Sequence, residues 1–251
     1  LIVDNTAAPI TCKPIEHGAS IVVYSLTKWI GGHGTSIGGA VIDGGNFNWG
    51  QNAKFPTISS PHYSMEGINF FEEFGPIAFT AKLRAEAMYN FGPSLSPTNA
   101  FYFLQGIETL PLRMQKHMEN TNKVLNYLSG HPNVNWVRHP SLKNHSGYEL
   151  AKRMFPKGAG SIITFGIKGG RESGKAFIEA LEMCSHLANV GDAKTLVIHP
   201  ASTTHSHIDK TAMVDSGLTE DMIRLSVGLE DFEDIKLDFE KGFRSIKNYK
   251  S

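Results

Sequence analysis

Lys28 is the residue whose type and position most clearly suggest chemistry. It follows a short β-branched run at residues 21–24 and precedes the glycine-rich stretch GGHGTSIGG at residues 31–39. A lysine amine that is held rigidly and partly desolvated forms a Schiff base with a carbonyl group. Ser25 and Thr27 flank it with hydroxyl groups that can bind a phosphate. The glycines after it would let a bulky ring approach the backbone, so we expect a ring-shaped cofactor beside them.

Asp4 adds a second group to this candidate site. It directly follows the β-branched run LIV at residues 1–3. If the two runs are neighbouring parallel strands, their carboxyl ends meet at one edge of a sheet. A carboxylate there can pair with a pyridinium nitrogen, as in enzymes that use pyridoxal 5′-phosphate (PLP). Taken singly, Asp4 fits a turn and Lys28 fits a solvated surface, but together they predict a PLP site.

The usual nucleotide-binding motifs do not explain the glycines. In a P-loop the glycines precede the lysine, whereas here they follow Lys28. Gly32 and Gly34 match the first two positions of the dinucleotide fingerprint, but Ile37 occupies the third and Gly38 comes one residue late. We therefore reject both the P-loop and the dinucleotide-binding motif.

The composition argues against two classes of binding partner. The 24 basic and 24 acidic residues balance, which argues against nucleic acid or an anionic membrane as the main partner. We see neither a signal peptide nor an apolar run long enough to span a membrane. Cys12 and Cys184 lie far apart and form no metal or redox motif, which favours two buried thiols in a reducing cytoplasm. His199, His205 and His207 lack accompanying carboxylates or cysteines, so we expect no metal site there.

The hydrophobic pattern predicts an α/β chain. We expect strands at residues 1–3, 21–24 and 38–43, an irregular segment at 44–75 and a helix at 77–89. A helix should then break near Pro111 and continue as a long amphipathic helix to Gly130. Beyond it we expect a helix at 173–187 capped by Ser173, a closing helix at 231–249, and strands at 134–140, 161–169, 195–200 and 223–230.

Four blocks of sequence carry a family resemblance. They are DNT at residues 4–6, SLTKWIGGHG at 25–34, NVGDAKTLVIHPASTTH at 189–205 and IRLSVGLED at 223–231. In this order they resemble the Cys/Met-metabolism family of PLP-dependent enzymes over essentially the whole chain. The resemblance implies the PLP-dependent transferase fold (aspartate-aminotransferase-like, fold type I). Residues 1–115 would form part of the large PLP-binding domain, and residues 116–251 the small α+β C-terminal domain.

The resemblance also implies roles for individual residues. Lys28 corresponds to the Schiff-base lysine and Asp4 to the aspartate on the pyridine nitrogen, while Ser25 and Thr27 correspond to the phosphate-binding hydroxyls. The substrate α-carboxylate would be bound by Arg224 and Asn189, with Thr204 nearby. An arginine suits that role because its planar guanidinium can bind a carboxylate through two hydrogen bonds.

Within the family, three stretches look most like O-acetylhomoserine sulfhydrylases. They are the long segment at residues 44–75, SPTNAFYFLQGIETLPLRM at 96–114 and NVGDAKTLVIHPASTTH at 189–205. That similarity implies replacement of the acetoxy group of O-acetyl-L-homoserine by sulfide or a thiol, in a homo-oligomer, expected to be a tetramer built from dimers. A γ-lyase or γ-synthase of the same family remains an alternative. So does an inactive fragment, because the family's phosphate loop and ring-stacking residue would precede Leu1. We therefore expect an N-terminal segment of the same protein to be needed for activity.

Overall fold

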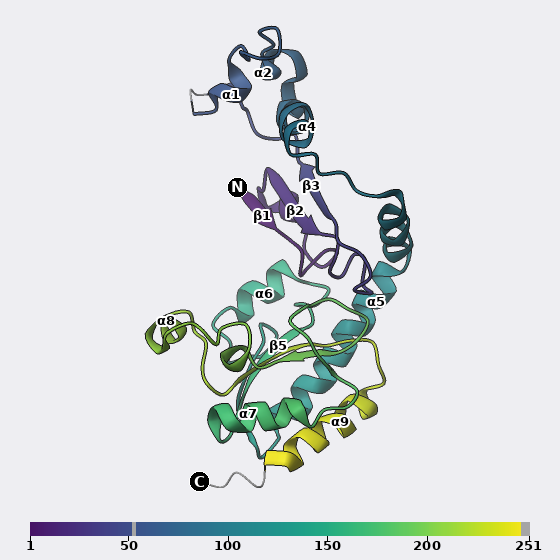
Figure 1. Ribbon diagram of the computed structural model, residues 1–251, viewed down its shortest axis with the longest axis vertical. Coiled ribbons are helices and arrows are strands. Elements are labelled where there is room, and N and C mark those ends of the chain that lie inside the picture. The colour runs from purple at the N-terminus through teal and green to yellow at the C-terminus, as the bar shows by residue number, and fades with distance from the viewer. Residues whose placement is uncertain (52–53, 247–251) are drawn as a thin grey trace.

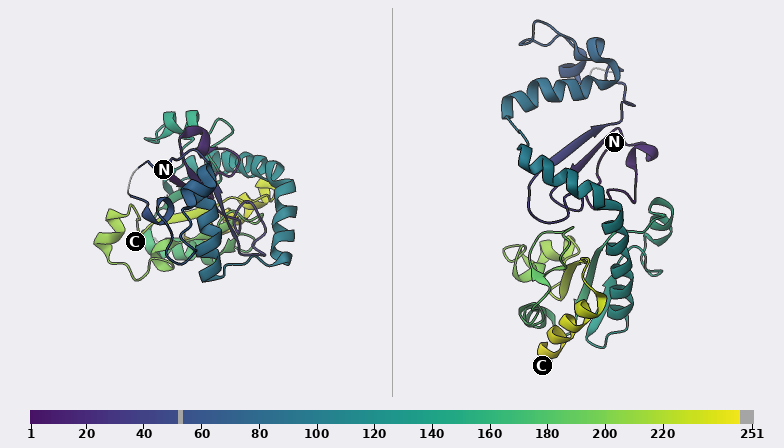
Figure 2. Two further views of the ribbon diagram at one scale, coloured as in Figure 1. Left: turned by 90° about the horizontal axis from the view of Figure 1, so that it is seen from above. Right: turned by 90° about the vertical axis from the view of Figure 1, so that its right-hand side faces the viewer.

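The computed structural model describes residues 1–51 and 54–246. The molecule is elongated and contains two sheets, one above the other along its long axis (Figure 1). The long helix α5 (Pro97–Ser129) runs beside both sheets, as the side view also shows (Figure 2). No helix in these two ranges is both long enough and apolar enough to cross a membrane.

The first sheet brings the predicted strand ends together. It has the order β1 (Ile2–Asp4), β2 (Ile21–Ser25) and β3 (Gly39–Asp43), and the short helix η1 (Pro14–His17) lies between β1 and β2. β1 and β2 are parallel, with Asp4 opposite Val23, whereas β3 is antiparallel to β2. The carboxyl ends of β1 and β2 therefore lie at one edge, as expected.

Residues 44–51 and 54–91 form an arm of short helices above this sheet (Figure 1). The helices are α1 (Pro56–Ser59), α2 (Phe70–Phe74), η2 (Gly75–Ile77), α3 (Ala78–Lys82), the π-helical η3 (Leu83–Met88) and α4 (Tyr89–Phe91). The expectation of an irregular segment at 44–75 missed α1 and α2, whereas the helix expected at 77–89 is present. Trp49 stacks on Phe79, and its cluster with Phe47 and Phe55 holds the arm together.

Helix α5 is continuous, so the break predicted near Pro111 is wrong. Ser96 caps the helix by accepting a hydrogen bond from the Asn99 amide at 3.1 Å. Pro111 removes one helical hydrogen bond, but it lies on the exposed side, where water can satisfy the freed carbonyl. Leu110 and Met114 next to it are buried against Trp29, and this burial keeps the helix intact. It ends before Gly130, as predicted.

The second sheet has the order β4 (Val134–Arg138), β5 (Ile162–Ile167), β8 (Met222–Ser226), β7 (Leu196–Ile198) and β6 (Ser185–His186). Among the described residues, β6 and β7 pair in parallel, whereas the other neighbouring strands of this sheet pair antiparallel. Its main core is formed with α5, α7 (Gly170–Glu179) and α9 (Phe232–Ser245). Three short helices complete this part, namely α6 (Tyr148–Met154), η4 (Pro200–Ser202) and α8 (Lys210–Asp215).

Two expectations for this second part are wrong. Ser173 does not cap α7, because the helix begins at Gly170 and Ser173 is buried inside it. The same helix ends at Glu179, and the end of the segment expected to be helical forms β6 instead.

Cys12 and Cys184 are both buried free thiols, as predicted. The division into domains at residues 115 and 116 stays a prediction.

Candidate active site

Lys28 lies in a hydrogen-bonded turn just beyond β2. The Gly31 amide donates to Leu26 O at 2.8 Å, and the Gly32 amide donates to Lys28 O at 2.7 Å. The next residue, Trp29, is fully buried, and its indole N–H donates to Ser161 Oγ at 3.0 Å. Because Trp29 is anchored in this way, the half-buried Lys28 beside it has a defined position.

Asp4 lies at the same edge and is linked to the end of β2 through Thr6. The Thr6 amide donates to Asp4 Oδ1 at 2.9 Å, and Thr6 Oγ1 accepts from the Ser25 amide at 2.8 Å. Hydrogen bonds from the side chain and the backbone of Thr6 lower the pKa of Asp4. The carboxylate is therefore ionised at neutral pH, which is the state that would bind a protonated ring nitrogen.

The two candidate hydroxyls differ in their surroundings. Thr27 Oγ1 accepts from the Gly38 amide at 3.2 Å, and its own proton has only a long contact of 3.4 Å to Gly38 O. Over residues 1–51 and 54–246, no hydrogen bond to the Ser25 hydroxyl is present. Both hydroxyls therefore keep the capacity to donate to an anion.

Asn189 and Arg224 join Lys28 from the second part of the chain. Lys28 Nζ donates to Asn189 Oδ1, although the two residues are 161 positions apart in sequence. Along β8, Ile223 and Leu225 enter the core, so alternation places Arg224 on the opposite face. One terminal nitrogen of Arg224 donates to Ala188 O at 2.6 Å and contacts Asn189 O at 3.5 Å, and burial lowers the pKa of the guanidinium.

Thr204 is not joined to these residues by any hydrogen bond in the part of the chain that the structure describes. It is exposed, and its hydroxyl pairs with His205 Nδ1 at 2.8 Å. The neighbouring His199 is buried, with Nδ1 bonded to Ser202 Oγ at 2.7 Å and Nε2 to Glu220 O at 2.9 Å. Because both ring nitrogens are used in these contacts, His199 helps to hold the loop after β7 in place.

The glycine-rich stretch makes room for protein side chains, which corrects the expectation that it makes room for a cofactor ring. A Cβ atom on Gly38 would lie 2.5 Å from the Phe103 ring, and one on Gly31 would lie 3.0 Å from it. A Cβ atom on Gly34, whose φ is +63°, would lie 2.5 Å from Asp192 Oδ2. Helix α5 and the loop after β6 therefore occupy the space that these glycines leave.

Gly32 makes room for Arg113, a residue that sequence analysis missed. The buried Arg113 guanidinium donates to Trp29 O at 2.7 Å, to Ile30 O at 3.0 Å and to Gly106 O at 2.6 Å. It thus holds the two residues after Lys28 against α5. One signal was available, because Arg113 falls at helical spacing within the apolar stripe of α5.

Residues 1–244 match the family described as Cys/Met metabolism PLP-dependent enzyme. The chain is 48% identical to an O-acetyl-L-homoserine sulfhydrylase of Leptospira meyeri, over 98% of this chain and 58% of that protein. It therefore spans little more than half the length of this relative.

Solved structures of similar proteins agree with this family match. A putative O-acetylhomoserine (thiol)-lyase of Campylobacter jejuni, whose crystal structure contains a pyridoxyl-lysine phosphate, superposes with a TM-score of 0.92 at 35% identity, covering 97% of this chain and 58% of that one. A cystathionine γ-synthase of Xanthomonas oryzae gives 0.77 at 30% identity, covering 99% and 56%. These similarities confirm the predicted PLP-dependent transferase fold, of which this chain forms a part.

Proposed function

Because this chain belongs to the family of Cys/Met metabolism PLP-dependent enzymes, we propose that it carries the lysine-bearing part of a γ-replacement site. The substrate would be O-acetyl-L-homoserine, and sulfide or a thiol would replace its acetoxy group. The products are acetate and either L-homocysteine or a thioether such as methionine. The similarity to an O-acetyl-L-homoserine sulfhydrylase supports this substrate class. The proposal concerns the whole protein that contains this chain.

The edge of the first sheet fits pyridoxal 5′-phosphate. Lys28 would hold it covalently, the ionised Asp4 would bind its ring nitrogen, and the hydroxyls of Ser25 and Thr27 would bind its phosphate. The fit is supported by the Thr6 hydrogen bonds that keep Asp4 ionised and by the donor capacity left on both hydroxyls. When bound, this cofactor acts as an electron sink that acidifies the protons at Cα of an amino acid.

Lys28 is the group proposed to move protons. Its amine contacts Asn189 Oδ1, which would keep the free amine within the site beside the substrate. The free Nζ would remove the proton from substrate Cα. A second proton would then leave Cβ, the Cγ–O bond would break to release acetate, and the sulfur atom of sulfide or a thiol would form the new bond to Cγ. Both protons would then be returned, one to Cβ and one to Cα, so that the net change is the exchange of acetate for the sulfur group at Cγ.

Arg224 is the proposed partner of the substrate carboxylate. Over residues 1–51 and 54–246, only one of its terminal nitrogens forms hydrogen bonds, and these go to Ala188 O and Asn189 O. The remaining N–H groups are available for a carboxylate, and burial strengthens such a pair by reducing its exposure to water. Asn189 would assist through its side chain, and Thr204 is retained as a more distant candidate.

The contact between Lys28 Nζ and Asn189 Oδ1 carries this proposal, because it joins the candidate cofactor edge to the candidate substrate loop. The test is Lys28→Ala in the whole protein, followed by borohydride reduction and peptide mass analysis. We expect the wild type to carry a reduced pyridoxyl group on Lys28 and the variant to carry none. Lys13→Ala, at an exposed lysine, is the matched control. A pyridoxyl group on another lysine in Lys28→Ala would contradict the assignment.

A γ-synthase or γ-lyase activity is the second candidate, favoured by the similarity to a cystathionine γ-synthase. Supplying O-acetyl-L-homoserine with sulfide or with cysteine, and supplying methionine alone, separates the three activities by product. Homocysteine formation from sulfide at the highest kcat/KM supports the sulfhydrylase. If the purified sample is instead a single species near 27.6 kDa that binds no PLP, the result would support the alternative of an inactive fragment.

Three further statements stay predictions. They are the tetramer built from dimers, the cytoplasmic location, and the need for a further segment of the same protein. The last is supported by the greater length of the relatives.

A further inference from the structure

Three polar side chains lie on one buried stripe of α5. Arg113, His117 and Asn120 are spaced four and three residues apart, which places them on the same face of the helix. Their exposed fractions are 6%, 0% and 0%. Buried polar groups are unfavourable unless they form hydrogen bonds, so the partners of this stripe explain its presence.

The upper end of the stripe binds the Lys28 turn. Arg113 donates to the carbonyls of Trp29 and Ile30, the two residues that follow Lys28. A third bond, to Gly106 O, fixes the guanidinium to its own helix. Arg113 therefore restrains the backbone that carries the Lys28 amine without contacting the amine itself.

The lower end of the stripe binds the chain that leaves β8. His117 Nδ1 lies 2.6 Å from Val227 O, so this nitrogen carries the proton. Asn120 Nδ2 donates to Gly228 O at 3.0 Å and to Glu230 O at 2.8 Å. These carbonyls lie a few residues after Arg224 on the same strand and its extension.

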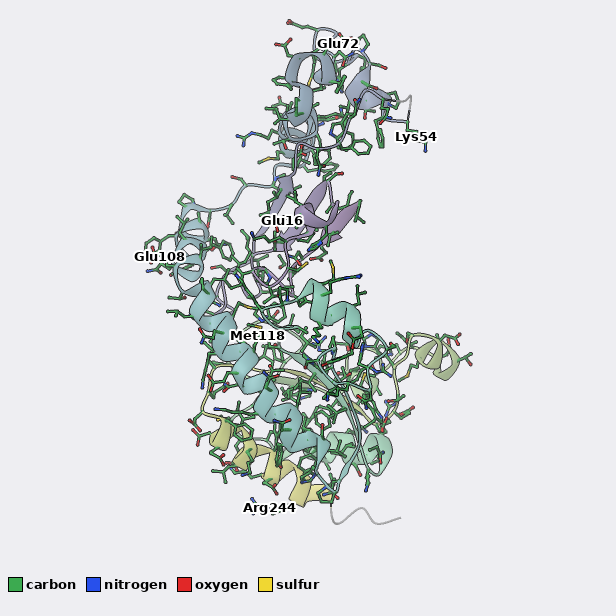
Figure 3. The ribbon with its side chains drawn as sticks, turned by 180° about the vertical axis from the view of Figure 1, so that it is seen from behind. Glu16, Lys54, Glu72, Glu108, Met118 and Arg244 are labelled. Atoms are coloured by element: carbon green, nitrogen blue, oxygen red, sulfur yellow. The ribbon has the colours of Figure 1, made fainter. Side chains whose placement is uncertain are left out.

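We propose that Arg113, His117 and Asn120 are positioning residues that set the placement of the Lys28 amine relative to the Arg224 guanidinium. A rigid helix rises about 1.5 Å per residue, so the seven residues from Arg113 to Asn120 separate the two backbone attachments by roughly 10 Å along its axis. Figure 3 labels Glu108 and Met118, which bracket Arg113, on the part of α5 that passes from the first sheet to the second. The inference rests on the proposed function of Lys28 and Arg224.

The two ends of the stripe should affect catalysis differently. In the whole protein, Arg113→Met frees the Lys28 turn, so kcat should fall about 100-fold while KM for O-acetyl-L-homoserine stays within about threefold. Asn120→Leu frees the chain after Arg224, so KM should rise about tenfold. Lys123→Met and Asn122→Leu, at exposed positions of the same helix, are the matched controls and should change neither constant by more than about twofold.

A second measurement is independent of activity. Hydrogen exchange at the amides of Gly31 and Gly32 should accelerate at least about tenfold in Arg113→Met and remain unchanged in Asn120→Leu. If Arg113→Met does not fold, Arg113→Lys replaces it, because a lysine keeps the charge but loses the planar fork. It should give an intermediate acceleration of exchange and an intermediate loss of kcat.

Two results would overturn the inference. One is unchanged exchange at Gly31 and Gly32 in both Arg113 variants. The other is an equal effect of Arg113→Met and Asn120→Leu on kcat and KM, which would indicate a general loss of folded protein. The proposed function would fail on a different measurement. A pyridoxyl group that persists in Lys28→Ala would contradict the role of Lys28, but it would not change the hydrogen exchange at Gly31 and Gly32.

Discussion

The substitution Gly32→Ala probes how closely the Lys28 turn packs against α5. Gly32 has φ of +73°, and an added Cβ atom would lie 2.0 Å from Arg113 Nη1 and 2.6 Å from Arg113 Cζ. An arginine on a surface would swing aside. Here the guanidinium is bonded to Trp29 O and Ile30 O, so the new methyl group must break those bonds or displace the turn.

The expected cost follows from these two effects. An alanine in the left-handed region costs about 1–2 kcal/mol more than glycine. Each buried hydrogen bond from a charged donor contributes about 1.5–3 kcal/mol, and two of them are disturbed. Partial relaxation of the turn favours the lower end, so we expect the free energy of unfolding to fall by about 4 kcal/mol. That is a large part of the roughly 5–15 kcal/mol that stabilises an ordinary protein.

Urea unfolding of the whole protein, followed by tryptophan fluorescence, measures this loss, and the buried Trp29 lies close to the substitution. Gly18→Ala is the matched control, because Gly18 has φ of +90° and an added Cβ atom would meet nothing within 4 Å. It should cost only the backbone strain, about 1–2 kcal/mol. If the two variants lose the same stability to within about 1 kcal/mol, the close packing of Arg113 on Gly32 is refuted.

Two further predictions concern the second part of the chain. Asp238 is 2% exposed and accepts hydrogen bonds from the amides of residues 182–184 at 2.8–3.1 Å. Asp238→Asn should therefore cost about 3 kcal/mol in urea unfolding, whereas Asp234→Asn, at an exposed position of α9, should cost less than about 0.5 kcal/mol. Burial lowers the pKa of His117 to about 4, below its unfolded value of 6.5, so the unfolded chain binds the proton more tightly. His117 should therefore stabilise the protein above pH 6.5 and lose this contribution as the pH falls towards 4. The free energy of unfolding in urea should be measured at pH 7 and at pH 4.5. Between these two values it should fall by about 2.5 kcal/mol less in His117→Gln than in the wild type. Equal acid sensitivity of the two proteins would contradict this reasoning.

The sequence predicted the elements that depend on local pattern. Short β-branched runs marked β1 and β2, and the residues at their ends placed Asp4 and Lys28 at one sheet edge. The resemblance to a family predicted the fold, which comparison with solved structures confirms. The errors at Pro111 and Ser173 have a common cause, because both rested on local helix rules that packing against the rest of the molecule overrode.

The packing around Lys28 was beyond local reasoning. Arg113 lies 84 residues from the carbonyl of Trp29 that it binds, and Asn189 lies 161 residues from Lys28. The place of Arg113 within the apolar stripe of α5 could have indicated that it is buried, but nothing in the pattern around Trp29 indicates that its carbonyl needs a donor. These contacts depend on how α5 crosses the two sheets, which a single sequence does not specify.

The glycines after Lys28 show how two readings of one pattern can be separated energetically. If a glycine leaves room for a cofactor, replacing it by alanine weakens the cofactor-bound state and leaves the cofactor-free protein intact. If it leaves room for a side chain of the protein, the cost arises in both states. Because Arg113 fills the space beside Gly32, the stability lost in Gly32→Ala should be the same with and without PLP. A loss confined to the PLP-bound protein would restore the reading that the sequence alone suggested.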